Sequence, residues 1–151
     1  MTAVVIPMHP PSGGTVQLHR ILGVLPENTW AWSIFDLWAV GVAPRGMTMP
    51  AFEDLVQTSA TGYRMTWREL TDAASRLDQV HDCLIVAADS PHLLSRPLSG
   101  RPGLLVVIEA LDSGRWEVEI SERLDGADAM RERLASLVRG PGASGRESGC
   151  G

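Results

Sequence analysis

Lysine is absent from this chain of 151 residues, so all thirteen basic residues are arginine, against eighteen acidic residues and a net charge of −5. This acidic balance argues against nucleic acid as a partner, because phosphate binding needs a concentrated basic field. It favours instead a basic protein, which an acidic surface attracts by electrostatic steering.

Long apolar runs and a cysteine framework are also missing. The longest apolar runs, residues 29–35 and 37–43, are too short to cross a bilayer, and the first residues lack the basic region of a signal peptide. Of the two cysteines, Cys83 lies in an apolar run and Cys150 beside the C-terminal glycine, which is typical of reduced thiols. We therefore expect a cytoplasmic protein of bacterial type that makes no membrane contact.

Both ends of the chain are rich in residues that disfavour packing. Residues 1–14 contain three prolines and two glycines, and residues 140–151 are mostly glycine, serine and charged residues. Such segments bury too little surface to offset their loss of conformational entropy. We expect a disordered N-terminal segment over 1–14, a single α+β domain over 15–139 and a disordered C-terminal tail over 140–151.

Turn and capping residues divide the first half of this domain. Residues 16–25 and 29–40 are rich in β-branched and aromatic residues on either side of a turn, which predicts a long β-hairpin. Thr48 and Pro50 precede an apolar stripe that predicts a helix to about Ser59. Thr66 and Glu69 fit a capping box, and the spacing that follows predicts a helix to about Leu77.

The second half contains a strand, a hairpin and a helix. Residues 83–88 form an apolar run typical of a central strand, and Asp112-Ser113-Gly114 separates two strands over 104–111 and 115–121. Asp125 is expected to cap a helix over 127–139. The order is then β-β-α-α-β-β-β-α, which predicts an α+β fold: a mostly antiparallel sheet of about five strands, with about three helices on one side.

One cluster of reactive side chains is found in His81-Asp82-Cys83, with His92 following. Two functional hypotheses are a metal site and a Cys–His nucleophile pair, since His81 and Cys83 could share one face of a strand. The spacing of a zinc site is missing, and nothing marks the thiol as activated. A small buried cysteine is the favoured interpretation, with no metal, no cofactor and no assigned catalytic residue.

Carboxylates on strands are a second candidate for chemistry. Asp36 is predicted to lie mid-strand between aromatic residues, and Glu109 follows an apolar run, so either could be partly buried. Acid–base catalysis uses pairs of such groups, although acidic residues on strands more often form a solvated face. A small enzyme or ligand-binding domain that uses Asp36 and Glu109 is therefore the alternative function.

Five tryptophans are many for this length, beside one tyrosine and two phenylalanines. Most are expected in the core, but Trp30, Trp32 and Trp38 follow one another along a single predicted strand. A tryptophan surface ringed by carboxylates is typical of a protein-binding hot spot. We therefore predict that a partner contacts Trp30, Trp32 and Trp38 together with Glu117 and Glu119, which alternation directs to water.

Residues 108–118, with residues 28–32 and 66–70, resemble small bacterial proteins of the immunity type, which neutralise a toxin by binding it. The resemblance implies an acidic, cytoplasmic, non-enzymatic inhibitor. From the residues themselves, three functions stay open: a protein-binding module with a basic partner, the small enzyme, and a structural subunit that forms a homodimer through an edge strand.

Overall fold

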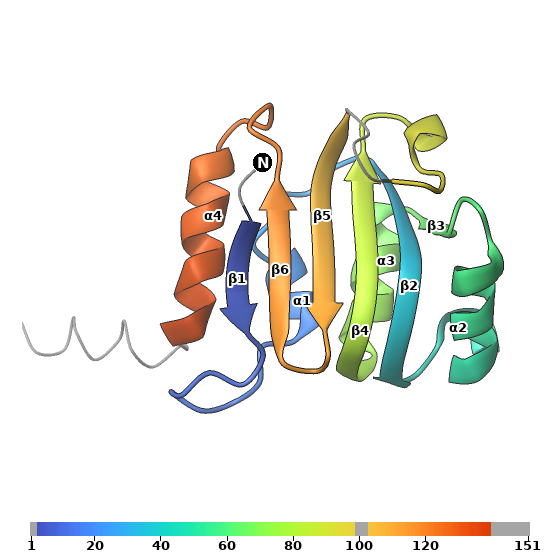
Figure 1. Ribbon diagram of the computed structural model, residues 1–151, viewed down its shortest axis with the longest axis horizontal. Coiled ribbons are helices and arrows are strands. Elements are labelled where there is room, and N and C mark those ends of the chain that lie inside the picture. The colour runs from blue at the N-terminus through green and yellow to red at the C-terminus, as the bar shows by residue number, and fades with distance from the viewer. Residues whose placement is uncertain (1–2, 99–102, 140–151) are drawn as a thin grey trace, which may run out of the picture.

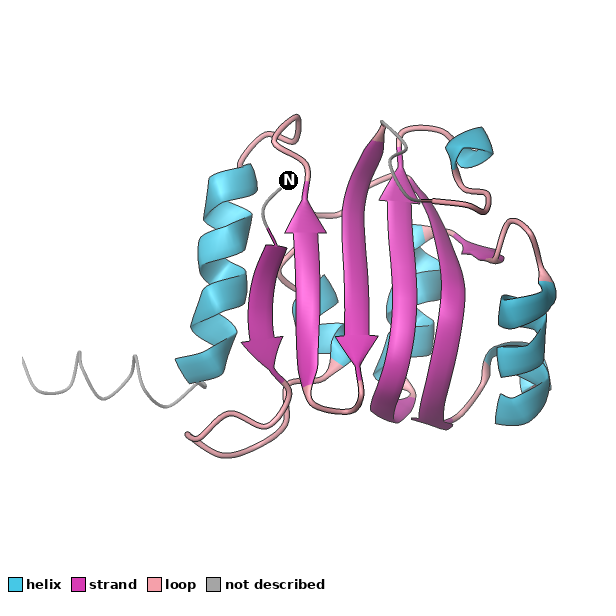
Figure 2. Cartoon of the chain, in the orientation of Figure 1, coloured by secondary structure: helices cyan, strands magenta, loops and turns pink. Residues whose placement is uncertain are grey.

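An antiparallel sheet organises residues 3–98 and 103–139, the part of the chain that this computed structural model describes (Figure 1). Its six strands follow the order β1-β6-β5-β4-β2-β3, and every neighbouring pair is antiparallel. The α+β class with an antiparallel sheet is thus confirmed. The described residues form six strands rather than about five, and four α-helices rather than about three (Figure 2).

The helices and strands have the following bounds along the chain: β1 (Ala3–Pro7), α1 (Leu18–Leu22), β2 (Ala31–Gly41), α2 (Met49–Thr58), β3 (Tyr63–Met65), α3 (Trp67–Ser75), β4 (Leu77–Ala88), β5 (Leu104–Leu111), β6 (Arg115–Ile120) and α4 (Ala127–Ser136). Single 3-10 turns lie at Pro44–Gly46, Pro91–Leu93 and Leu137–Arg139. None of the helices described here is long and apolar enough to cross a membrane.

Helices α2 and α3 and the β5–β6 hairpin, which depend on capping and turn residues, lie where the sequence predicts them. Thr48 accepts a hydrogen bond from the backbone of Ala51 at the start of α2, and both hydrogen bonds of the Thr66–Glu69 capping box form. Strands β5 and β6 join through the expected tight turn. The last helix differs in one detail: Gly126, with φ 75°, is its N-cap, and Asp125 makes no capping bond there.

The N-terminal segment contradicts the prediction that residues 1–14 are disordered. Strand β1 pairs with β6, and Ile6 and Met8 are 0% and 2% exposed. The apolar residues before Pro7 form the strand, and the proline comes only at its end, where it interrupts no ladder. Residues 140–151, predicted to be a disordered tail, lie outside the described residues.

The predicted hairpin over 16–25 and 29–40 is wrong in its first arm. Residues 18–22 form helix α1, and its buried residues Leu18, Ile21 and Leu22 stand at helical spacing. This short helix contacts α3 and buries its apolar residues in the main core. The element order is therefore β-α-β-α-β-α-β-β-β-α.

A bulge in β2 reverses the direction of its side chains. The register with β4 shifts between Ile34 and Asp36, so Phe35 is an extra residue and the alternation inverts beyond it. The Arg96 guanidinium donates a 2.6 Å hydrogen bond to the Phe35 carbonyl and lies over its ring. Trp32 consequently points into the main core, whereas Trp38 points to the opposite face of the sheet.

The two faces of the sheet are covered unequally. Helices α1 and α3 lie behind the sheet in Figure 1 and bury the main core, while α2 lies along β2 and α4 along β1. Buried residues of α2 and α4 also belong to the main core, which agrees with the prediction that the helices lie on one side of the sheet. On the other face, residues 89–98 cover one end of the sheet and bury Phe35, Val86, Ala88 and Leu94. We call the rest of that surface, across β1, β6, β5, β4 and β2, the open face.

Candidate functional site

The open face brings together acidic residues that are far apart in the sequence. Cross-strand pairing sets Asp36, Leu84, Glu109, Glu117 and Val5 in one row across five strands. Neighbouring strands are spaced by about 4.8 Å, so successive side chains in the row are near neighbours. Two further acids stand in the adjoining rows, Asp82 on β4 and Glu119 on β6.

Negative charge on the open face is poorly compensated. The strand residues that point to this face include five carboxylates but only one guanidinium, that of Arg115. The Arg115 Nε lies 2.9 Å from Glu117 Oε2. Glu109 stands directly opposite Glu117, an arrangement that is unfavourable for like charges. Glu109 and Glu119 form no ion pair with any described residue, so a bound cation would relieve their repulsion.

The neighbouring carboxylates also affect the pKa of Glu109. Partial burial raises the pKa of the Glu109 carboxyl, and the negative charges of Glu117, Glu119 and Asp36 raise it further. Because these groups come from three different strands, the effect is a property of the assembled sheet.

Trp38 is the exposed aromatic residue of the open face, with 58% of its surface accessible. Its ring stacks on His81 with 4.7 Å between the centroids, and His81 Nδ1 is held 2.6 Å from the Ser113 hydroxyl. Asp82, opposite Trp38, accepts a hydrogen bond from the Asp112 backbone. Trp38 thus packs against His81, and the nearest carboxylates on its face are Asp36 and Asp82.

Asp36 and Glu109 share the open face but are not adjacent. Leu84 stands between them in the row, which separates their Cα atoms by about 10 Å, two strand spacings. Gln57 of α2 donates a hydrogen bond to Asp36. Neither carboxylate lines any of the four cavities given for the described residues.

A second feature, which we call the tryptophan pocket, lies at the end of the sheet where β2 begins and β4 ends. This cavity of about 720 Å³ is lined by Trp30, Trp32 and Trp67, among others. The Trp32 ring centroid lies 6.1 Å from that of Trp30 and 5.5 Å from that of Trp67. Trp30 and Trp67 are partly exposed, while Trp32 is 1% exposed and so offers a partner almost no surface.

Trp67 was not singled out as a binding residue from the sequence. In the sequence, Trp67 is recognisable only as the first residue of a capped helix. It lies near Trp32 because α3 packs on the sheet, which the sequence pattern does not reveal. The five residues predicted to bind a partner therefore divide into two places. Trp38, Glu117 and Glu119 lie on the open face, and Trp30 and Trp32 lie at the tryptophan pocket.

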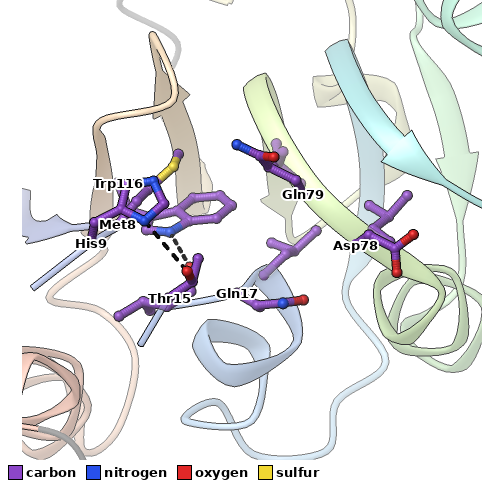
Figure 3. Close-up of a pocket in the computed structure, with 11 residues that line it drawn as sticks. Met8, His9, Thr15, Gln17, Asp78, Gln79 and Trp116 are labelled. Carbon is purple, nitrogen blue, oxygen red and sulfur yellow. Dashed lines mark hydrogen bonds between the residues drawn. The ribbon is translucent and has the colours of Figure 1, made fainter. Parts of the chain in front are cut away.

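Another cavity, shown in Figure 3, lies between the segment after β1 and the first residues of β4. Met8, Thr15 and Trp116 are among its lining residues, and the Trp116 indole donates to the Val16 carbonyl. Its volume is about 10 Å³. A space of that size holds about one water molecule and cannot admit a ligand.

The His81-Asp82-Cys83 cluster is divided between the two faces of the sheet. Cys83 is 2% exposed in the main core, and burial raises the pKa of its thiol. A second irregularity in the β2–β4 ladder, at His81, places that ring against Trp38, so the expectation that His81 and Cys83 share a face is wrong. Among the described residues, no group of three His, Cys, Asp or Glu side chains is placed to hold a metal ion.

Comparison of the chain with protein-family models, curated proteins and solved structures finds no match. The arguments that follow therefore rest on the geometry of the open face and of the tryptophan pocket.

Proposed function

We propose that this chain is a non-enzymatic binding protein whose open face docks a basic surface of another protein. The observation that carries the proposal is the group of five carboxylates on the open face, with Arg115 as the one guanidinium on its strands and Trp38 exposed beside them. Opposite charges on two surfaces speed their encounter and suppress wrong partners.

Trp38 is the anchor of the proposed interface. An exposed indole flanked by Asp36 and Asp82 matches the anatomy of a hot spot, in which a large aromatic side chain is desolvated inside a charged rim. Its contact with His81 limits the rotamers that must be frozen on binding.

Glu109 is the carboxylate at which a cation from the partner would relieve the most repulsion. Its pKa is raised first by partial burial and then by the negative charges of neighbouring acids, which repel its ionised form. An arginine or lysine from the partner, placed between Glu109, Glu117 and Glu119, would offset that repulsion, so the free protein is poised to gain from a cation at this position.

The resemblance to immunity proteins supplies the biological class within this proposal. It implies that the partner is a basic toxin domain and that the two proteins meet in the cytoplasm. The edge-strand dimer is less well supported, because α4 lies along the edge strand β1 and the other edge strand, β3, has only three residues. The enzyme is less well supported because Leu84 separates Asp36 from Glu109, and neither lines a cavity given for the described residues.

Two triple variants with the same change in net charge test the proposal. The first, Asp36→Asn with Glu109→Gln and Glu119→Gln, removes charge from the open face. The control, Asp54→Asn with Glu122→Gln and Glu132→Gln, removes it from exposed positions elsewhere. Each protein is immobilised and exposed to lysate of the source cell, and association is then measured with the purified protein that the wild type retains.

We expect the first variant to associate more slowly and with a weaker dependence on salt, and the control to behave as the wild type. Trp38→Ala should speed dissociation about 30-fold, which corresponds to a hot spot of about 2 kcal/mol. The proposal is wrong if the two triple variants bind alike. It is also wrong if no protein is retained and the chain instead turns over a small molecule in a manner that needs Asp36 or Glu109.

A further inference from the structure

We propose that the tryptophan pocket binds a small molecule in which a flat aromatic ring is joined to an anionic group. This site is separate from the open face and does not depend on the proposed function. At about 720 Å³, the cavity lies within the usual range of 300 to roughly 1,000 Å³ for small-molecule sites.

The tryptophans supply the surface for the ring. Trp32 is fixed in the core, and its indole N–H donates a 2.9 Å hydrogen bond to Asn28 Oδ1. Asn28 Oδ1 also accepts a hydrogen bond from the backbone of Trp30, which holds that residue beside Trp32. Trp30 and Trp67 each pack against the fixed ring and remain partly exposed. Partly exposed indoles held in place in this way are suited to stacking on a planar group.

The lining residues that form no ion pair carry a net positive charge, which favours an anionic ligand. Of the lining carboxylates, Asp89 lies 2.8 Å from Arg123 and Glu69 lies 3.7 Å from Arg45. Glu69 also accepts the backbone hydrogen bond of its capping box. Both are therefore compensated by arginines that do not line the pocket.

The pocket is lined by two arginines and by one carboxylate that forms no ion pair with a described residue. Arg68 forms no ion pair with a described residue, and Arg64 uses one nitrogen to donate a 2.9 Å hydrogen bond to the Pro91 carbonyl. Glu27 is the lining carboxylate without an ion pair among the described residues. The uncompensated charge is thus positive, although the protein as a whole is acidic.

The position of α3 adds to this local field. Trp67 and Arg68 are the first residues of the helix, and their backbone N–H groups have no partner within it. The capping box engages the neighbouring groups of Thr66 and Glu69. An anionic group beside Arg68 would therefore meet a guanidinium and the positive end of the helix, while its ring lies against Trp30 and Trp67.

Nucleotides and aromatic carboxylic acids share this chemistry, and calorimetric titration of the full chain distinguishes them. The probes are adenosine monophosphate, 4-hydroxybenzoate, uncharged adenosine and inorganic phosphate. We expect one or both of the first two to bind with a dissociation constant below about 1 mM. Adenosine and phosphate, which each lack half of the recognised chemistry, should bind at least about 10-fold more weakly.

Arg68→Gln removes the guanidinium without touching the core, since Arg68 is exposed, and should weaken binding of the charged probe about 10-fold or more. Arg133→Gln, an equal change on the exposed surface of α4, is the matched control and should leave binding unchanged. Trp30→Leu should also weaken binding, and circular dichroism identifies a variant that has unfolded.

The proposal is overturned if neither charged probe binds the folded wild type at 1 mM, or if Arg68→Gln and Arg133→Gln bind equally. Adenosine binding as tightly as its monophosphate would overturn the assignment of an anionic ligand.

Discussion

Replacing Ile6 with alanine is expected to destabilise the protein by about 3 kcal/mol, the middle of the range for truncating a buried isoleucine. Ile6 lies in β1, is 0% exposed and stands opposite Trp116, which is 1% exposed, in the β1–β6 ladder. Truncation would leave a void against Trp116, whose indole is fixed by its hydrogen bond to Val16 and cannot move freely to fill it.

Thermal unfolding followed by circular dichroism measures this cost. For a domain of this size, 1 kcal/mol lowers Tm by about 3 °C, so Ile6→Ala should lower it by about 9 °C. Urea unfolding should give the same loss of free energy with an unchanged slope, provided that the variant keeps the native fold.

The neighbouring residue provides a matched control. Val5 belongs to the same strand but points to the open face and is 56% exposed, so Val5→Ala should change stability by no more than about 0.5 kcal/mol. Equal, small effects of the two substitutions would refute the reasoning. They would show that β1 is not docked and that the proline- and glycine-rich composition of residues 1–14 decides the behaviour of this segment.

Three further predictions concern single residues. Glu109→Gln should raise stability at pH 7 by roughly 0.2–1 kcal/mol, the range for like charges facing across strands. Because the pKa of Glu109 is raised in the folded state, its cost grows as pH rises through the unfolded pKa, so urea unfolding at pH 3 should show no gain. Thr66→Ala should cost about 1 kcal/mol in urea unfolding by removing the cap of α3, and Thr71→Ala in the same helix should cost less. Cys83→Ser should cost roughly 1–3 kcal/mol in thermal unfolding through a buried hydroxyl, and one zinc per chain, lost in that variant, would contradict a structural role.

The elements that could be predicted from the sequence are those whose stabilising contacts are local. The Thr66–Glu69 box and the Thr48 cap satisfy hydrogen bonds within one helical turn. The turn at Asp112 and Ser113, both with positive φ, joins strands that are adjacent in the chain. Alternation along β6 likewise places Trp116 in the core, because a strand that buries one face repeats every two residues.

The candidate site could be predicted only in part. Glu117 and Glu119 were placed correctly on the water-facing side of their strand, and Trp38 was identified as an exposed aromatic residue. The structure separates Trp38 from Trp30 and Trp32, because side chains along β2 do not alternate without interruption through Phe35. A bulge breaks that period, and its carbonyl is satisfied by Arg96, which is sixty-one residues away along the chain.

The sequence by itself determined that this protein is acidic and that its fold is α+β with an antiparallel sheet. It also determined the positions of most helix starts and turns. Each of these properties depends on composition or on contacts within a few residues. The tertiary structure alone decided that β1 adds an edge to the sheet, that residues 18–22 are helical and that five distant carboxylates share one uncovered face. Pairing and burial between distant segments outweigh local propensity there, because a strand or helix is stable only where a partner surface buries it.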